Sequence, residues 1–293
     1  TGRHADANAI LVPKANAEPK AQVTPTPAPT QTPVSAEVFP SGDNSLFFNR
    51  AKDFSAKGEY EKAIADFKKA VQLNPQDAEA FFERGIAYQY SGDASLAFED
   101  YRTALRIKPD WVAKADLLCL LYNPAQDSPD KGIENCGKAV STFTEFGLGY
   151  FQLANAYTAK GDYYNAILNY NAAIEKKPKF LVAVLNRGNA HNLKGDSERA
   201  IADLNFVIEN KPNSAEAYNF RGSAYQNKKD SRRALADFNK AIELNPALDT
   251  AYLNRGSFYE AAGELDRALA DYEKALQINP NLADIYYRRA NAY

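Results

Sequence analysis

Methionine is absent from the 293 residues, and cysteine, histidine and tryptophan are scarce, with two, two and one respectively. Because a primary translation product starts with methionine, a chain that begins at Thr1 and has none is expected to be a processed mature form or a fragment. Removal of a signal peptide would explain both observations. We therefore expect an exported protein of bacterial type, located in the periplasm or outside the cell.

A strong excess of charge is also lacking. The chain has 35 lysines and arginines against 37 aspartates and glutamates, which gives a net charge of −2. Such a balance produces no broad field that attracts phosphate backbones, so nucleic acid is not an expected partner. The apolar runs are far shorter than the roughly 20 residues that span a bilayer, so no membrane span is predicted.

Motifs for catalysis and for metal or cofactor binding are missing as well. His4 lies near the start of the chain, and His191 occupies a position that aromatic residues fill elsewhere in the repeat described below, which indicates a core residue. The two cysteines and two histidines do not have the spacing of a zinc site. Residues 147–149 lack the rest of a dinucleotide-binding loop, and no phosphate-binding Gly-Lys-Ser/Thr run occurs. We expect no metal, no cofactor and no enzymatic activity.

Residues 1–43 have the composition of a tail or linker rich in proline, threonine and alanine. Between Val23 and Pro33 nearly every residue is proline or threonine. This composition favours solvated polyproline II and cannot build a core. A flexible spacer is the simplest interpretation, and a stalk glycosylated at its threonines is the alternative.

The rest of the chain is built from a repeat of 34 residues. A proline marks the end of most units, at Pro75, Pro109, Pro178, Pro212, Pro246 and Pro280. The units are 44–77, 78–111, 112–146, 147–180, 181–214, 215–248 and 249–282, followed by a half-unit, 283–293. The third unit, 112–146, is one residue longer and degenerate. Self-similarity at this period predicts a solenoid.

Small and large residues alternate in the same way in each unit. The eighth position is small, with Ala51, Gly85, Ala154, Gly188, Gly222, Gly256 and Ala290, and the twentieth is Ala63, Ala97, Ala166, Ala200, Ala234 and Ala268. The twenty-fourth position is large, with Phe67, Tyr101, Tyr170, Leu204, Phe238 and Tyr272. Apolar residues recur at helical spacing on two segments, separated by a turn that usually contains glycine. We expect two helices per unit, packed closely where small residues meet large ones.

These columns resemble the tetratricopeptide repeat, which has small, aromatic, alanine, aromatic and proline positions at matching offsets. The resemblance extends over residues 44–293. It implies an all-α fold, a right-handed superhelical solenoid of antiparallel helix pairs in which the first helix of each pair lines a concave groove. It also implies a non-catalytic scaffold that binds protein or peptide ligands.

An arginine at the seventh position and an aspartate at the twenty-third recur together. The arginines are Arg50, Arg84, Arg187, Arg221, Arg255 and Arg289, and the aspartates are Asp66, Asp100, Asp203, Asp237 and Asp271. The unit 147–180 lacks both and has Leu153 and Asn169 instead. Because the two residues are present or absent together, we predict an ion pair between the two helices of a unit rather than a phosphate-binding row of cations.

Amides are frequent on the face that the family resemblance assigns to the groove. They are Asn49, Gln152, Asn155, Asn186, Asn189, Asn192, Asn219, Gln226, Asn227 and Asn254. Because each side-chain amide has a donor and an acceptor, a row of them can pair with the N–H and C=O groups of an extended peptide. The interpretation is a peptide-binding groove that depends little on ligand sequence. Solvated amides without a ligand are the alternative.

The degenerate unit 112–146 contains both cysteines. Cys119 and Cys136 have about the separation that joins the arginine and aspartate columns, so they could face each other across the helix pair. In an oxidising compartment they would form a disulfide, and a pair of buried thiols is the alternative. Pro124 and Pro129 interrupt the pattern, so we expect the solenoid to bend or change register here.

The half-unit 283–293 has no second helix to cover its apolar residues. Either the natural protein continues, or this end stacks on another molecule. Head-to-tail stacking that does not close builds a filament. A homopolymer, in which the chain is a self-assembling subunit of an extracellular fibre, is therefore the alternative function, with insertion of the 1–43 tail into a neighbour's groove as a second route.

Overall fold

The computed structural model describes residues 42–109, 115–124, 126–142, 144 and 147–282. They belong to two compact units, which divide the chain between Leu121 and Tyr122, inside the degenerate repeat. We call them the N-terminal unit and the C-terminal unit. The described residues form fourteen α-helices and no strand, which confirms the all-α prediction. The predictions for residues 1–41 and for the half-unit 283–293 lie outside the described residues.

The N-terminal unit consists of two helix pairs and one short helix. Its helices are α1 (Gly42–Ala56), α2 (Tyr60–Leu73), α3 (Ala78–Ser91), α4 (Ala94–Ile107) and α5 (Ala115–Leu120). The pairs α1–α2 and α3–α4 coincide with the first two predicted repeats. The six-residue α5 stands where the degenerate repeat was expected to have its first helix.

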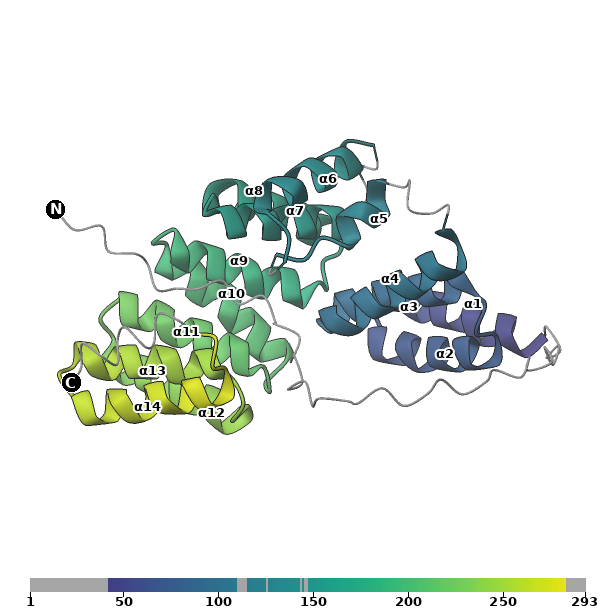
Figure 1. The fold of residues 1–293 in the computed structure, drawn as a ribbon. Coiled ribbons are helices and arrows are strands. Elements are labelled where there is room, and N and C mark those ends of the chain that lie inside the picture. The colour runs from purple at the N-terminus through teal and green to yellow at the C-terminus, as the bar shows by residue number, and fades with distance from the viewer. Residues whose placement is uncertain (1–41, 110–114, 125, 143, 145–146, 283–293) are drawn as a thin grey trace, which may run out of the picture. The chain divides into compact units, whose positions relative to one another are not determined.

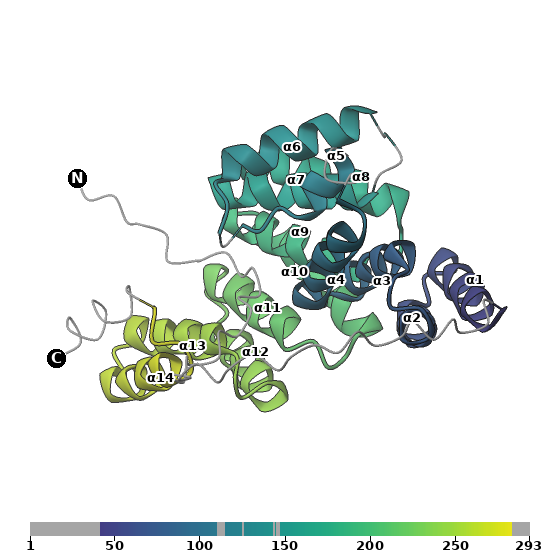
Figure 2. The same ribbon diagram turned by 45° about the vertical axis from the view of Figure 1, so that its right-hand side comes forward.

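The C-terminal unit begins with a single helix and continues with four antiparallel pairs (Figures 1 and 2). Its helices are α6 (Pro129–Thr142), α7 (Gly147–Lys160), α8 (Tyr163–Lys176), α9 (Leu181–Leu193), α10 (Ser197–Asn210), α11 (Ala215–Asn227), α12 (Ser231–Leu244), α13 (Asp249–Ala261) and α14 (Leu265–Ile278). In each pair we call the helix that comes first in the chain the first helix and the other the second helix.

Local sequence explains where these helices begin and end. The second helices end two residues before the proline of their repeat, as α12 does at Leu244 before Pro246, because the residue that precedes a proline is disfavoured in helical conformation. Several begin after an aspartate whose carboxylate caps the free N–H groups of the first turn. Asp162, Asp196 and Asp230 each accept a hydrogen bond from the backbone N–H three residues later.

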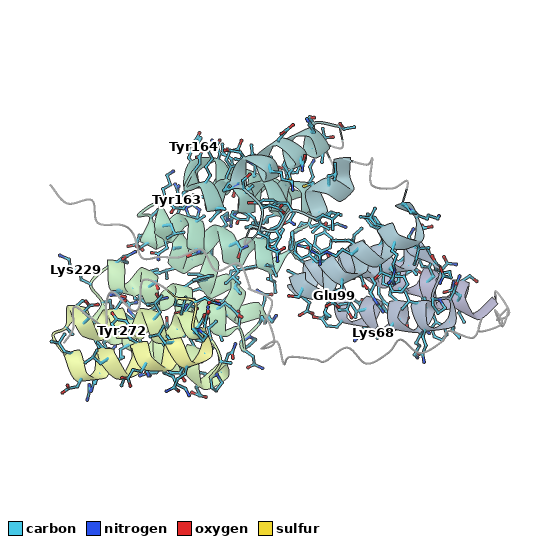
Figure 3. All side chains as sticks on the ribbon, in the orientation of Figure 1. Lys68, Glu99, Tyr163, Tyr164, Lys229 and Tyr272 are labelled. Atoms are coloured by element: carbon cyan, nitrogen blue, oxygen red, sulfur yellow. The ribbon has the colours of Figure 1, made fainter. Side chains whose placement is uncertain are left out.

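The turn between the two helices of a pair contains one residue in the left-handed conformation. Glycine supplies it in five turns, at Gly58, Gly92, Gly161, Gly195 and Gly263, with φ between +75° and +101°. In the turn from α11 to α12 the residue is Lys229, at φ +61° (Figure 3). A side chain with a Cβ is strained in this region, whereas glycine is not.

Replacing Lys229 by glycine is therefore expected to raise the free energy of unfolding by about 0.5–1 kcal/mol, because the strain is relieved. Lys229→Ala is the matched control, since it removes the same side chain but keeps the Cβ. Urea-induced unfolding followed by circular dichroism measures both. Equal stabilisation by alanine would show that backbone strain is not the cause.

Close packing of small against large residues joins the two helices of each pair. A Cβ added to Gly85 would lie 2.6 Å from the ring of Tyr101, and one added to Gly256 would lie 2.7 Å from the ring of Tyr272. Both rings are fully buried. The packing predicted from the eighth and twenty-fourth positions is thus confirmed at these sites.

The predicted ion pairs between the first and second helix are present in every described unit that has both residues. They are Arg50–Asp66, Arg84–Asp100, Arg187–Asp203, Arg221–Asp237 and Arg255–Asp271. In each, Nε and Nη2 of the guanidinium donate to the two carboxylate oxygens over 2.5–2.8 Å. Two parallel charge-assisted bonds fix the helices in both distance and orientation.

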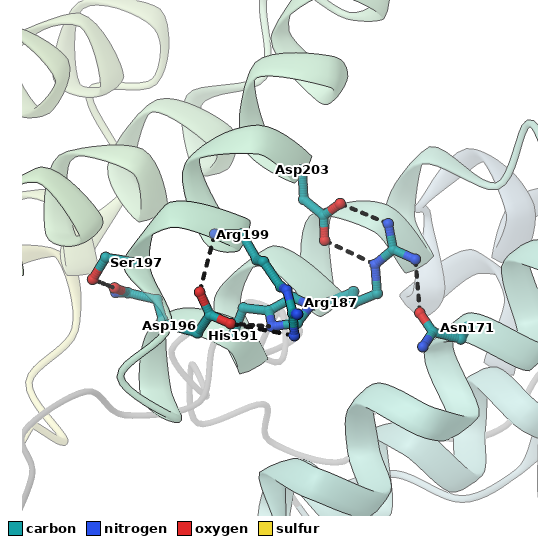
Figure 4. A network of polar contacts seen from close by, with 8 residues as sticks. Asn171, Arg187, His191, Asp196, Ser197, Arg199 and Asp203 are labelled. Atoms are coloured by element: carbon teal, nitrogen blue, oxygen red, sulfur yellow. Dashed lines mark hydrogen bonds and ion pairs between the residues drawn. The ribbon is translucent and has the colours of Figure 1, made fainter.

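In the C-terminal unit the same arginines also join neighbouring repeats. The remaining nitrogen, Nη1, donates to an asparagine on the second helix of the preceding repeat. The pairs are Arg187 with Asn171 at 2.7 Å, Arg221 with Asn205 at 2.7 Å and Arg255 with Asn239 at 2.6 Å. Figure 4 shows Arg187 between Asp203 and Asn171. Each arginine therefore connects three helices.

Both cysteines of the chain are oxidised in the structure. Cys119 and Cys136 are fully buried and disulfide-bonded. No free thiol occurs in the described part of the chain. The alternative of two buried thiols therefore does not apply.

Candidate functional site

The first helices of the C-terminal unit form one continuous side of it. Neighbouring first helices contact each other, α7 with α9, α9 with α11 and α11 with α13, whereas neighbouring second helices have no comparable contact. A stack of helix pairs curves toward the helices that lie closer together. We call the surface that α7, α9, α11 and α13 form on this side the inner face.

The amides of the inner face are hydrogen-bonded in pairs across neighbouring first helices. In each pair a side-chain N–H of the later residue donates to the side-chain oxygen of the earlier one. The pairs are Asn186 to Asn155 at 3.1 Å, Asn227 to Asn192 at 3.0 Å and Asn254 to Asn219 at 3.0 Å. These bonds join one repeat to the next and fix the orientation of each amide.

Three of the amides predicted to bind a ligand are enclosed instead. Gln152 and Asn192 are 2% exposed and Asn219 is not exposed at all. Gln152 donates to the backbone carbonyl of Tyr122 at 3.3 Å, and Asn219 donates to the hydroxyl of Thr250 at 3.5 Å. The interpretation of these three as groove residues is corrected, because their polar groups are satisfied inside the protein.

Asn155 lies at the centre of a small polar network. Its oxygen accepts from the hydroxyl of Tyr170 at 2.7 Å and from Asn186, and its N–H donates to Gln152 at 2.9 Å. Burial raises the pKa of the Tyr170 hydroxyl well above its usual range, so this group stays protonated and donates. The network thus links α7 to α8 through Tyr170 and to α9 through Asn186.

The other predicted amides keep part of their surface exposed. Asn186, Asn189, Gln226 and Asn254 are half-buried on the inner face. The side chains of Asn189 and Gln226 make no hydrogen bond to the residues that the structure describes. Asn49 is exposed on α1 of the N-terminal unit and is therefore not grouped with them. The inner face thus combines enclosed amides, which connect repeats, with amides whose polar groups remain accessible.

His191 lies in the core beside charged residues of its own repeat, as its position in an aromatic column predicts (Figure 4). It is 7% exposed, and its Nδ1 has no hydrogen-bond partner among the described residues. Burial lowers the pKa of His191, although the carboxylates of Asp203 and Asp196 act in the opposite direction. The nearest carboxylate oxygen, on Asp196, is 3.9 Å from Nδ1. The positive charges of Arg187 and Arg199 also lower the pKa of His191.

The lowered pKa of His191 predicts a loss of stability in mild acid. The unfolded chain takes up the proton near pH 6.5, before the folded protein does, so stability falls as pH drops below this value. The free energy of unfolding is expected to fall by at most about 1.4 kcal/mol per pH unit. Thermal unfolding between pH 7.5 and 5.5 measures it. His191→Tyr, which copies the aromatic residue of other repeats, should reduce the slope; an unchanged slope would assign it to other groups.

Tetratricopeptide-repeat family models match most of the region in which the helix pairs lie. The matched residues are 51–92, 78–110, 151–215, 215–248 and 250–282. Together they cover more than half of the chain and coincide with the helix pairs of both units. The chain is a tetratricopeptide-repeat protein. No curated protein sequence matches it significantly.

Two solved structures show the same fold as this tetratricopeptide-repeat protein. A tetratricopeptide repeat protein from Parabacteroides merdae is 20% identical, with a TM-score of 0.56, over 85% of this chain and 98% of that one. A chain of the APC/C hetero-tetramer Cut9–Hcn1 is 17% identical, with a TM-score of 0.64, over 85% of this chain and 49% of that one. At these identities the likeness is one of fold.

Tetratricopeptide repeats are protein-interaction modules, so this chain is a scaffold for protein–protein interaction, of a fold that is generally non-catalytic. Within the described residues, no cluster of histidine, cysteine, aspartate and glutamate has the arrangement of a metal site. No helix in the described part of the chain is long and apolar enough to cross a bilayer.

Proposed function

We propose that the inner face of the C-terminal unit binds an extended segment of a partner protein. The observation that carries this proposal is the row of accessible amides on three successive first helices. They are Asn186 and Asn189 on α9, Gln226 and Asn227 on α11, and Asn254 on α13. Each offers hydrogen-bonding groups of both kinds, as the backbone of an extended peptide requires.

Several apolar side chains of the inner face are buried, which supports recognition of the ligand through its backbone rather than through its apolar side chains. Phe151, Phe220 and Leu253, which alternate with the amides in sequence, are 4%, 6% and 7% exposed. They pack inside the unit and offer a ligand little apolar surface. Leu185 on α9 keeps part of its surface accessible, but the amides supply most of the accessible groups named here, so polar contacts would supply much of the affinity.

An exported location, in the periplasm or outside the cell, is part of this proposal. The support is the oxidised state of Cys119 and Cys136, since disulfides persist in oxidising compartments and are rare in the cytosol. The filament alternative depends on residues 283–293 and on the tail. These lie outside the described residues, and we do not propose it further.

Selection from a display library of random 15-residue peptides on the full chain tests the proposed function. Selected peptides are expected to lose about tenfold or more in affinity for the variant Asn186→Ala/Asn254→Ala, which removes one accessible amide from each of two helices. Asn210→Ala is the matched control, because Asn210 is an exposed amide on a second helix, α10. Equal binding by all three proteins would place the ligand elsewhere.

A further inference from the structure

A chain of hydrogen bonds with a fixed direction ends on the inner face. It begins at the backbone carbonyl of Tyr122, which can only accept and which receives a side-chain N–H of Gln152 at 3.3 Å. The oxygen of Gln152 accepts from Asn155 at 2.9 Å, and the oxygen of Asn155 accepts from Asn186 at 3.1 Å. Because the first acceptor is a carbonyl, each amide of the chain points its nitrogen back toward Tyr122. The oxygen of Asn186 is left at the open end.

Two more amides of the inner face have the same orientation. Asn227 donates its side-chain N–H to Asn192 at 3.0 Å, and Asn254 donates its own to Asn219 at 3.0 Å. The oxygens of Asn186, Asn227 and Asn254 make no hydrogen bond to the residues that the structure describes. None of the three is among the buried polar atoms that lack a partner. These oxygens are therefore within reach of a ligand.

The three fixed amides stand on successive first helices, α9, α11 and α13, and present the same group. One N–H of each is engaged by an amide of the preceding repeat, while the oxygen keeps its acceptor positions. Asn189 and Gln226 make no hydrogen bond to the described residues, so either end of their amides can turn toward a ligand. The fixed amides therefore act toward a ligand mainly as acceptors.

Resting on the proposed function, we infer that the inner face recognises the backbone N–H groups of an extended segment that has no proline at the contacted residues. In an extended chain the N–H groups of alternate residues point to the same edge, and proline has no N–H. Neighbouring packed helices lie about 10 Å apart, so α9, α11 and α13 span about 20 Å, or about six extended residues.

A segment without these N–H groups makes a poor ligand for a physical reason. Its carbonyl oxygens would face the oxygens of the fixed amides, and two acceptors cannot form a hydrogen bond with each other. Both would lose water on binding without gaining a partner, which costs affinity. The partner is therefore a proline-free extended segment of a protein, selected by its backbone donors and not by the charge of its side chains.

Three synthetic 12-residue peptides test this inference by NMR titration of the isotope-labelled full chain, a method that follows weak binding. The parent peptide alternates serine with threonine and has uncharged side chains. In the other two, six peptide N–H groups are replaced by ester oxygens, either at every second residue or at six consecutive residues in the middle. An ester lacks the donor and keeps a carbonyl and a similar shape.

The peptide with alternate esters is expected to bind within about twofold of the parent, because its other edge keeps every N–H. The peptide with consecutive esters has lost the donors of both edges over the span of the three helices, so it should bind at least about tenfold more weakly. Both carry the same number of esters, so their comparison removes any general effect of the ester group. Asn186→Ala/Asn254→Ala should weaken the parent peptide about tenfold, and Asn210→Ala should leave it unchanged.

Equal affinities of the two ester peptides would overturn the inference, and so would failure of the parent peptide to bind. If the parent binds through Asn186 and Asn254 while consecutive esters have no effect, the inference is refuted and the proposed function stands. If the display library also yields no ligand that depends on these two asparagines, both are refuted.

Discussion

Asp237→Ala is expected to lower the free energy of unfolding by about 3 kcal/mol. Among the residues that the structure describes, Asp237 is the only carboxylate that pairs with Arg221, and the side chains of Asp237 and Arg221 are 9% and 18% exposed. Removing the carboxylate leaves a largely buried guanidinium without a counter-charge, and two bonds of 2.8 Å are lost with it. Urea-induced unfolding followed by circular dichroism measures the loss. Glu243→Ala, which removes a surface pair with Lys240 on the same helix, should cost no more than about 0.5 kcal/mol.

The chain itself supplies a second control for this ion pair. The unit 147–180 has Leu153 and Asn169 in place of the arginine and the aspartate. Copying it, Arg221→Leu/Asp237→Asn removes both charges together and should cost less than Asp237→Ala alone, because no buried charge is left unpaired. A double variant less stable than the single variant would instead show that the pair contributes a large net attraction.

Asn219→Ala is expected to lower the free energy of unfolding by about 2 kcal/mol, whereas Asn189→Ala should change it by less than about 0.5 kcal/mol. Asn219 is fully buried, and its side chain bonds to Thr250 and Asn254 on the next first helix. Asn189 is half-buried and its side chain makes no bond to the residues described by the structure. Both substitutions remove an asparagine amide from the inner face. The difference between their effects on the free energy of unfolding therefore measures the contribution of burying a hydrogen-bonded amide.

Thermal and urea-induced unfolding measure the stability of the two variants. The affinity of library-selected peptides for each variant is measured as well. Asn189→Ala should weaken peptide binding at nearly unchanged stability. If Asn219→Ala were as stable as the parent chain, the amide bonds between first helices would not hold neighbouring repeats together. If both variants were equally unstable, burial would not separate structural amides from accessible ones.

Much of the fold followed from periodicity. Prolines at a spacing of 34 residues, small residues opposite large ones and the paired arginine and aspartate columns predicted the helix pairs and their internal contacts. These contacts lie within one repeat. Arg221 and Asp237, for example, are 16 residues apart, and the other four described arginine–aspartate pairs have the same separation. When two residues of every repeat contact each other at a constant separation, both appear as aligned columns in a single sequence.

The repeat pattern did not show which amides of the inner face are enclosed and which are accessible. Asn192 and Asn189 stand on one helix and look alike in sequence, yet the first is enclosed and the second is half-exposed. The amides that pair across neighbouring first helices are 31 or 35 residues apart, and each pair uses different positions of the repeat. No single column records such a contact. The asparagines that accept a hydrogen bond from Nη1 of Arg187, Arg221 and Arg255 do form a column, at the twenty-fifth position, so this contact between repeats has a signal in the sequence.

The repeat, the all-α class and the ion pairs inside most units follow from the amino-acid sequence alone, because they depend on residues close together in the chain. Which amides of the inner face are enclosed and which stay accessible became visible only once the helix pairs were packed together. Those outcomes depend on how one repeat is placed against the next, and the stagger between neighbouring first helices is set by packing across the whole interface rather than by any local pattern.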